Sequence, residues 1–163
     1  MKISKLISFL CVVFLVCCGK SEPKKEEKTQ KISTEVNNDN VKKIVFTAND
    51  VMKFNRTKFT ATANQKIILT LKHIGKLDKK IMGHNLVILK KDVNLIEFAT
   101  KAALAKDNNY IPKNTNQVLV QTKMLGGGES DTIEFTAPAA GEYDFICSFP
   151  GHYGMMKGKF IVN

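Results

Sequence analysis

The sequence predicts an all-β fold, a sandwich or barrel, for residues 42–163. From residue 42 onward, short runs rich in β-branched and aromatic side chains are separated by turn residues. Eight such runs in a stretch of this length are typical of a sandwich or barrel. Alternation is clear in one run, where Ile133 and Phe135 point to one face between polar neighbours. The expected strands are 42–47, 57–61, 66–72, 85–90, 117–121, 131–136, 142–147 and 158–162.

One stretch between the expected strands has a different period. Apolar side chains within 94–106 recur at helical spacing, and Asn94 and Glu97 are placed like a capping box. We therefore expect one helix near 94–106, inserted between strands. Because 44% of the 163 residues are apolar and only 4 are proline, the chain can bury the core of one domain that carries appendages.

The N-terminal residues have the pattern of a targeting segment. A short basic region precedes an apolar run over residues 6–18, which is too short to span a bilayer and is typical of a secretory signal peptide. The run ends like a bacterial lipobox, in which a cysteine is lipidated, and Cys18 fits this role better than Cys17, which follows the bulky Val16. We expect a lipoprotein signal peptide at 1–17 and a lipid on Cys18. An ordinary signal peptide with incidental cysteines is the alternative.

Residues 18–41 form a polar segment between the leader and the first expected strand. Its composition is mostly Lys, Glu, Ser, Thr and Asn, so it cannot bury enough surface to offset the entropy of ordering. We expect a lipidated, disordered tether that keeps the folded part in the periplasm or cell envelope, attached to a membrane through the lipid. No aspartate follows Cys18, which favours the outer membrane slightly under the sorting rule of enteric bacteria.

The charge balance limits the class of partner. Residues 42–163 hold 18 lysine and arginine side chains against 10 acidic ones, a net charge of +8. A basic domain can bind nucleic acid, an anionic membrane or an acidic protein. Nucleic acid is not expected as a partner, because no basic block exceeds two residues and the leader directs the chain away from the cytoplasm.

The C-terminal segment concentrates metal-binding chemistry. Cys147, His152 and Met156 place a thiol, an imidazole and a thioether within ten residues, and His84 begins an earlier expected strand. Two imidazoles, a thiolate and a weak, distant thioether describe a blue-copper electron-transfer site. The spacing is suitable, because Pro150 and the glycine after it favour a turn that returns His152 towards Cys147.

Two other chemistries could use the same side chains. A thiolate beside an imidazole could act as the nucleophile of an enzyme, but no orienting third residue is evident, and His84 and Met156 would have no role. We therefore do not expect an enzyme. Zinc accepts Cys and His ligands as well, and we expect it only where copper is scarce. Cys147 is the only cysteine after residue 18, which excludes an intradomain disulfide and multi-cysteine zinc or iron-sulfur sites.

Three motifs resemble azurin, the bacterial blue copper protein of the cupredoxin family. They are Met82-Gly-His-Asn85, Cys147-Ser-Phe-Pro-Gly-His152 and Met156-Lys-Gly158, and the resemblance covers essentially all of residues 44–163. It implies a Greek-key cupredoxin sandwich with a helical flap and one copper near one end. Azurins commonly carry a disulfide and a buried tryptophan, and this domain has neither a second cysteine nor any tryptophan.

The resemblance also implies roles for single residues. His84, Cys147 and His152 correspond to the equatorial ligands and Met156 to the long axial ligand. The carbonyl of Gly83 would face the copper from the opposite side. Asn85 and Phe149 match positions whose backbone N–H groups point at the thiolate sulfur. His73 matches a non-ligand histidine near the site that can titrate, and His152, expected on an exposed loop, would be the edge through which electrons leave.

The expected function is that of an extracytoplasmic electron carrier with a single copper that cycles between Cu(II) and Cu(I). A copper-binding protein for delivery, buffering or resistance is the alternative. Expected partners are redox proteins such as c-type cytochromes or membrane oxidoreductases, and the carrier itself is expected to be a monomer or weakly self-associating. Six apolar residues around the expected exit edge could form a docking patch or could simply complete the core: Leu77, Ile81, Met82, Phe149, Pro150 and Met155.

Overall fold

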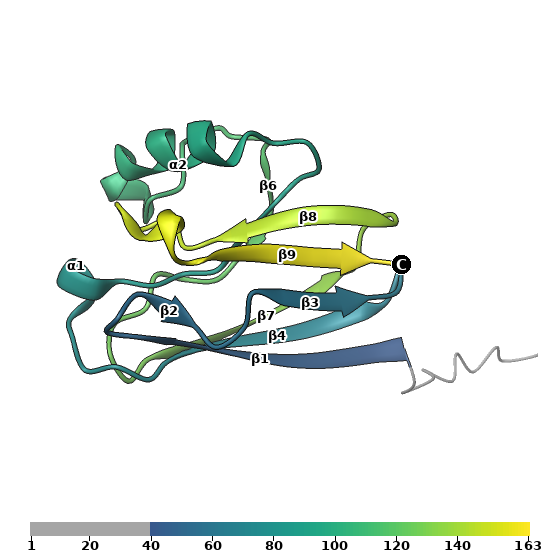
Figure 1. Cartoon of the computed structure of the whole chain (residues 1–163), viewed down its shortest axis with the longest axis horizontal. Helices are drawn as coiled ribbons and strands as arrows, with labels where there is room; N and C mark the ends of the chain where they lie inside the picture. Colours follow the sequence, from purple (N-terminus) through teal and green to yellow (C-terminus); the bar gives the residue numbers. More distant parts are fainter. Residues whose placement is uncertain (1–39) are drawn as a thin grey trace, which may run out of the picture. The chain divides into compact units, whose positions relative to one another are not determined.

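Two β-sheets form the fold in a computed structural model that describes residues 40–163 (Figure 1). The predicted signal peptide 1–17, the lipidation site Cys18 and nearly all of the predicted tether 18–41 lie outside the described residues. Within the described part, no helix is long and apolar enough to cross a membrane.

The first sheet has four strands in the order β2-β1-β4-β7. Its centre is a parallel pair, β1 (Val41–Asn49) and β4 (Lys66–His73). β7 (Ser130–Thr136) runs antiparallel to β4, and the two-residue β2 (Lys53–Phe54) runs antiparallel to the end of β1. β1 pairs with β4 and β4 with β7, although neither pair is consecutive in the chain, as expected for a Greek key.

The second sheet has five strands in the order β3-β9-β8-β5-β6. β3 (Lys58–Ala61) pairs in parallel with β9 (Lys157–Val162), whereas the other pairs are antiparallel. The remaining strands are β8 (Gly141–Ile146), β5 (Val87–Leu89) and β6 (Val118–Gln121). β8 and β5 matter most for function, because Cys147 follows the first and His84 precedes the second.

The inward faces of both sheets form one hydrophobic core. Side chains of β4 alternate, so that every second residue from Ile67 to His73 is buried while its neighbours are half-buried or exposed. Phenylalanine rings fill the space between the sheets: Phe46 meets Phe145 edge to face with ring centroids 5.3 Å apart, and Phe59 stacks on Phe160 at 4.3 Å. Such aromatic pairs stabilise the core beyond the area that they bury.

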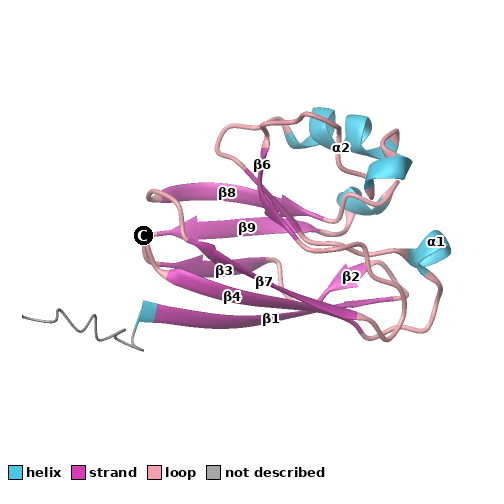
Figure 2. Cartoon of the chain, turned by 180° about the vertical axis from the view of Figure 1, so that it is seen from behind, coloured by secondary structure: helices cyan, strands magenta, loops and turns pink. Residues whose placement is uncertain are grey.

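A second, smaller core lies under the inserted helix, α2 (Leu95–Ala103). The Asn94 side chain accepts a hydrogen bond from the Glu97 N–H, as predicted for the cap. Phe98, which lies on the apolar face of α2, is buried with Ile146 of β8. Both views place α2 beside the five-stranded sheet, at the end of the molecule opposite the C-terminus (Figures 1 and 2).

The structure confirms the predicted all-β sandwich and each of the eight predicted strands, with ends that shift by up to two residues. The predicted helix near 94–106 is shorter than expected, because α2 ends at Ala103 and a separate 3-10 turn follows at Lys106–Asn108. Sequence analysis missed β2, the short helix α1 (Lys79–Met82) and a 3-10 turn at His152–Gly154. Each of these is too short to show a period in the sequence.

Candidate metal centre

Cys147 lies at the centre of a cluster of donor atoms. Its sulfur is 3.6 Å from Nδ1 of His152 and 3.8 Å from Nδ1 of His84. The carbonyl oxygen of Gly83 is also 3.8 Å from the sulfur. These three side chains are buried, and their possible donor atoms lie within 4.8 Å of one another. The structure therefore brings together the thiol and both imidazoles that the sequence singled out.

A tight loop after β8 explains how one segment supplies several donors. Gly151 has φ +82°, in the left-handed region that favours glycine, and the His152 N–H then donates to the Phe149 carbonyl at 3.0 Å. A 3-10 turn follows, and the Met156 N–H donates to the His152 carbonyl. The Cys147 N–H closes the loop by donating to the Met156 carbonyl at 2.9 Å. Met156 is completely buried.

His84 is held from two sides between α1 and β5. Its backbone forms two hydrogen bonds with Leu125, an isolated bridge between neighbouring segments. Its Nε2 lies 2.8 Å from the Asn49 carbonyl oxygen, which can only accept, so Nε2 carries the proton. Nδ1 is then the unprotonated nitrogen of the neutral ring, and it faces the Cys147 sulfur.

Burial sets the electrostatics of these groups. Burial raises the pKa of Cys147 to about 12, although backbone N–H groups of Asn85 and Phe149 donate to the sulfur and oppose this effect. Burial and the nearby imidazoles of His84 and His73 lower the pKa of His152 to about 4. Burial also lowers the pKa of His84. At neutral pH the cluster therefore offers two neutral imidazoles and a thiol that a bound cation would ionise.

These donors fit a soft or borderline metal ion. A thiolate, two imidazole nitrogens and a buried thioether are the ligand types that select copper or zinc over magnesium or calcium. The nearby side chains also suit a closed site, because a Cβ on Gly83 would lie 2.5 Å from the Lys79 carbonyl oxygen and 2.8 Å from the Phe149 ring. Glycine at position 83 thus lets its backbone approach the cluster.

Ser148 is a polar member of the site that sequence analysis missed. The Asn85 side chain donates to the Ser148 hydroxyl at 2.8 Å and accepts the Ser148 N–H at 2.9 Å. Both residues are buried, so this pair fixes the segment after His84 against the segment after Cys147. The only signal in the sequence is that each polar residue directly follows an expected ligand.

His73 lies beside the cluster and is fully hydrogen-bonded. Its ring stacks on His84 with centroids 4.5 Å apart. Nε2 donates to the Met82 carbonyl at 2.9 Å, and Nδ1 accepts the Gly75 N–H at 3.1 Å. Both ring nitrogens are therefore occupied, and His73 contributes no free donor atom, as expected for a histidine that is near the site without binding the metal.

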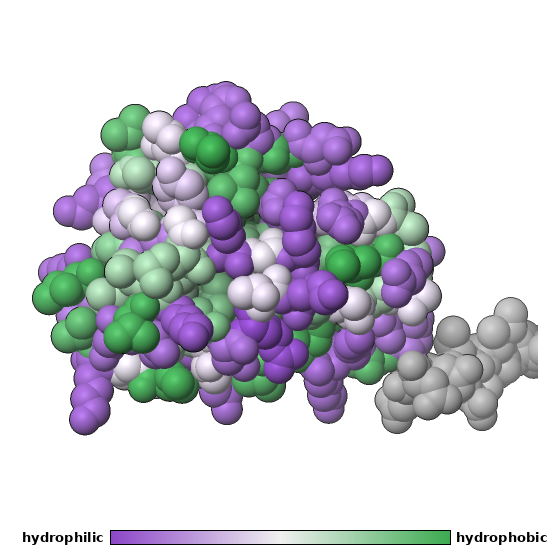
Figure 3. Space-filling view, in the orientation of Figure 1, coloured by the Kyte–Doolittle hydropathy of each residue, from purple (hydrophilic) through white to green (hydrophobic). Residues whose placement is uncertain are grey.

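The expected docking patch is exposed in part. Ile81 and Met155 are 65% and 64% exposed, and Leu77 and Pro150 are also exposed. Met82 is half-buried, and Phe149, only 9% exposed, belongs to the core instead. Figure 3 shows hydrophobic atoms at the end of the molecule that carries α1, among hydrophilic ones.

The loop around His152 is exposed, as expected, because Pro150, Gly151 and Met155 all face solvent, but His152 itself is largely covered. Its residue is only 4% exposed. The ring packs against the Phe149 ring with centroids 4.6 Å apart, and the Phe149 ring in turn contacts Tyr110. Phe149 from the same loop therefore covers one face of the imidazole, and Tyr110 from the segment after α2 packs behind Phe149.

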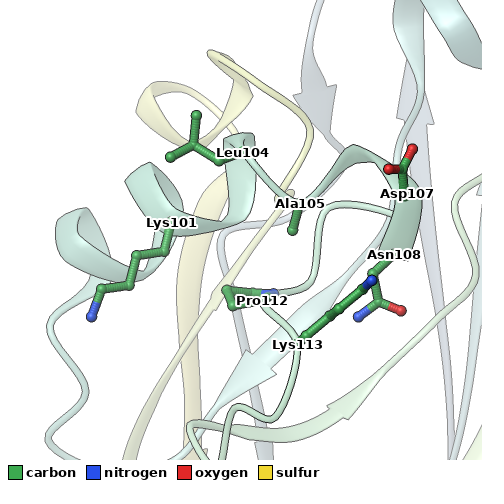
Figure 4. A pocket seen from close by; sticks show the side chains of 7 residues that line it. All are labelled: Lys101, Leu104, Ala105, Asp107, Asn108, Pro112 and Lys113. Atoms are coloured by element: carbon green, nitrogen blue, oxygen red, sulfur yellow. The ribbon is translucent and has the colours of Figure 1, made fainter.

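The surface pockets found in residues 40–163 are not lined by His84, Cys147 or His152. One is found at the C-terminal end of α2, where the side chains in Figure 4 line a depression with mixed charge. None of the metal-binding residues contributes to it. Its lining residues are Lys101, Leu104, Ala105, Asp107, Asn108, Pro112 and Lys113.

A Greek-key sandwich with buried Cys, His and Met donors at one end defines a copper protein of the cupredoxin class. Comparisons with known proteins agree. Residues 28–163 match the family described as copper binding proteins, plastocyanin/azurin family. The chain therefore belongs to the plastocyanin/azurin family.

Individual relatives span most of the domain. Azurin-1 of Alcaligenes xylosoxydans xylosoxydans is 42% identical over 114 residues, which cover 68% of this chain and 88% of that protein. Azurin-2 of the same organism is 44% identical over 118 residues, covering 68% and 89%. Auracyanin A, a "blue" copper protein from the green thermophilic photosynthetic bacterium Chloroflexus aurantiacus, has a similar structure, with a TM-score of 0.67 and 30% identity over 76% of this chain and 99% of that one.

Proposed function

We propose that His84, Cys147 and His152 hold one copper ion through Nδ1, Sγ and Nδ1, with Met156 as a weak axial ligand. The observation that supports this most is the convergence of three buried donor atoms within 4.8 Å. The protein is a blue copper electron carrier, and a bound copper supplies one-electron chemistry by alternating between Cu(II) and Cu(I). The Gly83 carbonyl oxygen, 3.8 Å from the Cys147 sulfur, would add a weak contact to the ion.

The task of the protein is to keep the donors in one place in both oxidation states. Backbone hydrogen bonds join Cys147 to Met156 and His152 to Phe149, and the buried Asn85 side chain ties the two ligand segments together. N–H groups of Asn85 and Phe149 stabilise negative charge on the sulfur. Fixed donors reduce the rearrangement that accompanies each electron transfer, and so favour rapid exchange with a partner.

Partners of this carrier are redox proteins, and c-type cytochromes or membrane oxidoreductases are the kinds that we propose. They would dock over Leu77, Ile81, Pro150 and Met155, which are exposed apolar residues of the predicted patch. A small apolar surface of this kind suits a weak, short-lived complex. Electrons would pass through the covered His152 ring and its Phe149 neighbour.

The burial of Cys147 supports a carrier over an enzyme. A nucleophilic cysteine needs an accessible thiolate, whereas this thiol is fully buried and has a pKa of about 12. Burial of the donors also argues against copper delivery, because a chaperone must present its ion to an acceptor. Delivery, buffering or resistance remains the second candidate for the same ligands.

A visible absorption titration of the full chain with Cu(II) tests the ligand proposal. We expect an intense blue thiolate-to-copper band that bleaches on reduction and returns on oxidation. Cys147→Ser should abolish the band, whereas Met156→Leu should keep it, because a weak axial ligand is not its source. A wild-type protein that binds Cu(II) without colour, or a band that survives in Cys147→Ser, would contradict the proposal.

The location of the carrier is a separate proposal. We infer a lipid on Cys18 that anchors the protein in the periplasm or cell envelope, with a slight preference for the outer membrane. Labelling of growing cells with a fatty acid tests the anchor, with Cys17→Ser as the matched control. Wild type and Cys17→Ser should both take up label and Cys18→Ser should not, and an unlabelled wild type would refute the anchor.

A further inference from the structure

A carboxylate on the turn between β1 and β2 joins two segments beside His84. Asp50 Oδ2 accepts the Lys76 N–H at 2.7 Å, and Oδ1 accepts the Leu77 N–H at 3.3 Å. Asp50 directly follows Asn49, whose carbonyl oxygen accepts a hydrogen bond from His84 Nε2. The carboxylate thus connects the turn that orients a proposed copper ligand to the loop that leads into α1.

Gly75 shows how closely the two segments approach. A Cβ at this position would lie 2.1 Å from Asp50 Oδ1 and 2.4 Å from its Cγ. The φ angle of Gly75 is not in the left-handed region, so an alanine would collide with the carboxylate without straining its own backbone. The Asp50 carboxylate therefore fits in its place only because residue 75 has no side chain.

The opposite side of the same loop is also fixed. The Gly127 N–H donates to the Leu77 carbonyl at 2.8 Å, and a Cβ on Gly127 would lie 2.5 Å from the Lys76 carbonyl carbon. The loop has little room to move away from Asp50. The bond from the Lys76 N–H holds the pKa of Asp50 below its usual range, and the Leu77 N–H and nearby histidines act in the same direction, so the group is a carboxylate at neutral pH.

We propose that Asp50 is a positioning residue of the metal centre. Its carboxylate fixes the 49–52 turn against the 74–78 loop, and thereby fixes the Asn49 carbonyl that orients the His84 ring. The proposal rests on the ligand set proposed above. Asp50 itself does not contact copper. It acts by fixing the tautomer and the direction of the His84 imidazole.

Two single variants and their combination test the contact. Asp50→Ala removes the acceptor, and Gly75→Ala displaces the carboxylate while its charge is kept. In the double variant the new methyl group on residue 75 enters the space that the carboxylate has left. Asp78→Asn is the matched control, because Asp78 lies in the same loop and its carboxylate accepts only the Lys80 N–H, at 2.8 Å, without touching the turn.

The first measurement is amide hydrogen exchange at Lys76 in the copper-free protein. Loss of a hydrogen bond to a charged group should speed this exchange about tenfold or more in both single variants. The second is the copper hyperfine splitting in the electron paramagnetic resonance spectrum, together with the reduction potential. Both should change in each single variant and stay at the wild-type values in Asp78→Asn.

The double variant should deviate no further than the worse of the two single variants, because both changes break one contact. Faster amide exchange with an unchanged copper spectrum would overturn the positioning role. So would a double variant whose deviation equals the sum of the deviations of the two single variants. Amide exchange does not depend on copper, and the wild-type blue band checks the ligand set by itself. A failure of the proposed function is therefore distinguishable from a failure of this inference.

Discussion

Binding of a divalent metal ion should release one proton from this protein, and that proton should come from Cys147. The thiol has a pKa of about 12, so at pH 7 only about one molecule in 10⁵ carries a thiolate. The pKa of His152 is about 4 and that of His84 is also lowered, so both imidazoles are already neutral at pH 7 and release nothing. Ionising the thiol costs about 7 kcal/mol at pH 7, from five pKa units at 1.36 kcal/mol each.

The release of this proton determines how the metal affinity changes with pH. Metal binding requires the thiolate, so affinity rises with pH, and the logarithm of the binding constant should increase by about one per pH unit between pH 6 and pH 8. Zn²⁺ is the better probe, because it binds Cys and His without oxidising the thiol. Isothermal titration calorimetry in two buffers of different ionisation enthalpy counts the protons released per ion.

Two outcomes would refute the reasoning. A release near zero would mean that Cys147 is already a thiolate in the metal-free protein, and therefore that burial does not dominate its pKa. A release of two or more would mean that a histidine is protonated before binding, against the lowered pKa of His152. Cys147→Ser is the control, and any metal that it still binds should release no proton.

Three further predictions concern stability. The metal-free protein should lose about 3 kcal/mol of unfolding free energy between pH 7 and pH 4, because the pKa of His152 is about 4 in the folded protein and 6.5 in the unfolded chain. Protons therefore bind the unfolded chain more tightly, and an unfolding free energy from urea titrations that does not change with pH would contradict this. Phe145→Ala should cost about 3–5 kcal/mol by the same assay, since Phe145 is fully buried among three other rings, and a loss no larger than that of half-buried Phe135→Ala would count against it. Ser148→Ala should lower the unfolding free energy by about 1–3 kcal/mol, because the buried Asn85 amide loses its hydrogen-bond acceptor. Thr100→Ala, at an exposed hydroxyl, should change it by about 0.5 kcal/mol or less, and equal effects of the two variants would refute the role of burial.

The ligand cluster was predictable because its information is local. Cys147, His152 and Met156 fall in one short loop, and the turn that returns them depends on Gly151, which has the positive φ that a glycine allows. The strands were predictable for a similar reason, since side chains in β4 alternate between core and surface over its whole length. Short elements such as α1, with only four residues, have no period to detect.

What the sequence could not provide is the covering of the site. His152 lies on an exposed loop, as predicted, yet only 4% of the residue is exposed, because Phe149 packs on its ring and Tyr110 packs behind Phe149. The Tyr110 contact joins segments far apart in the chain, as does the bond from His84 to the Asn49 carbonyl. Exposure and orientation of a side chain depend on such distant contacts, which composition and spacing do not contain.

The arrangement of the site links electron transfer to stability. Two neutral imidazoles and a thiol converge in a buried space, and burial disfavours the charged state of each of these groups. In the metal-free protein this costs folding free energy only in acid, where the unfolded histidines carry charge, and the packed phenylalanines around Phe46 and Phe145 offset that cost. A bound cation would take up both imidazoles as they are, and the sulfur once its proton has left. Ligand positions therefore need little adjustment when the metal binds or changes charge, and the rigidity that permits fast electron transfer is supplied by the core rather than by the metal.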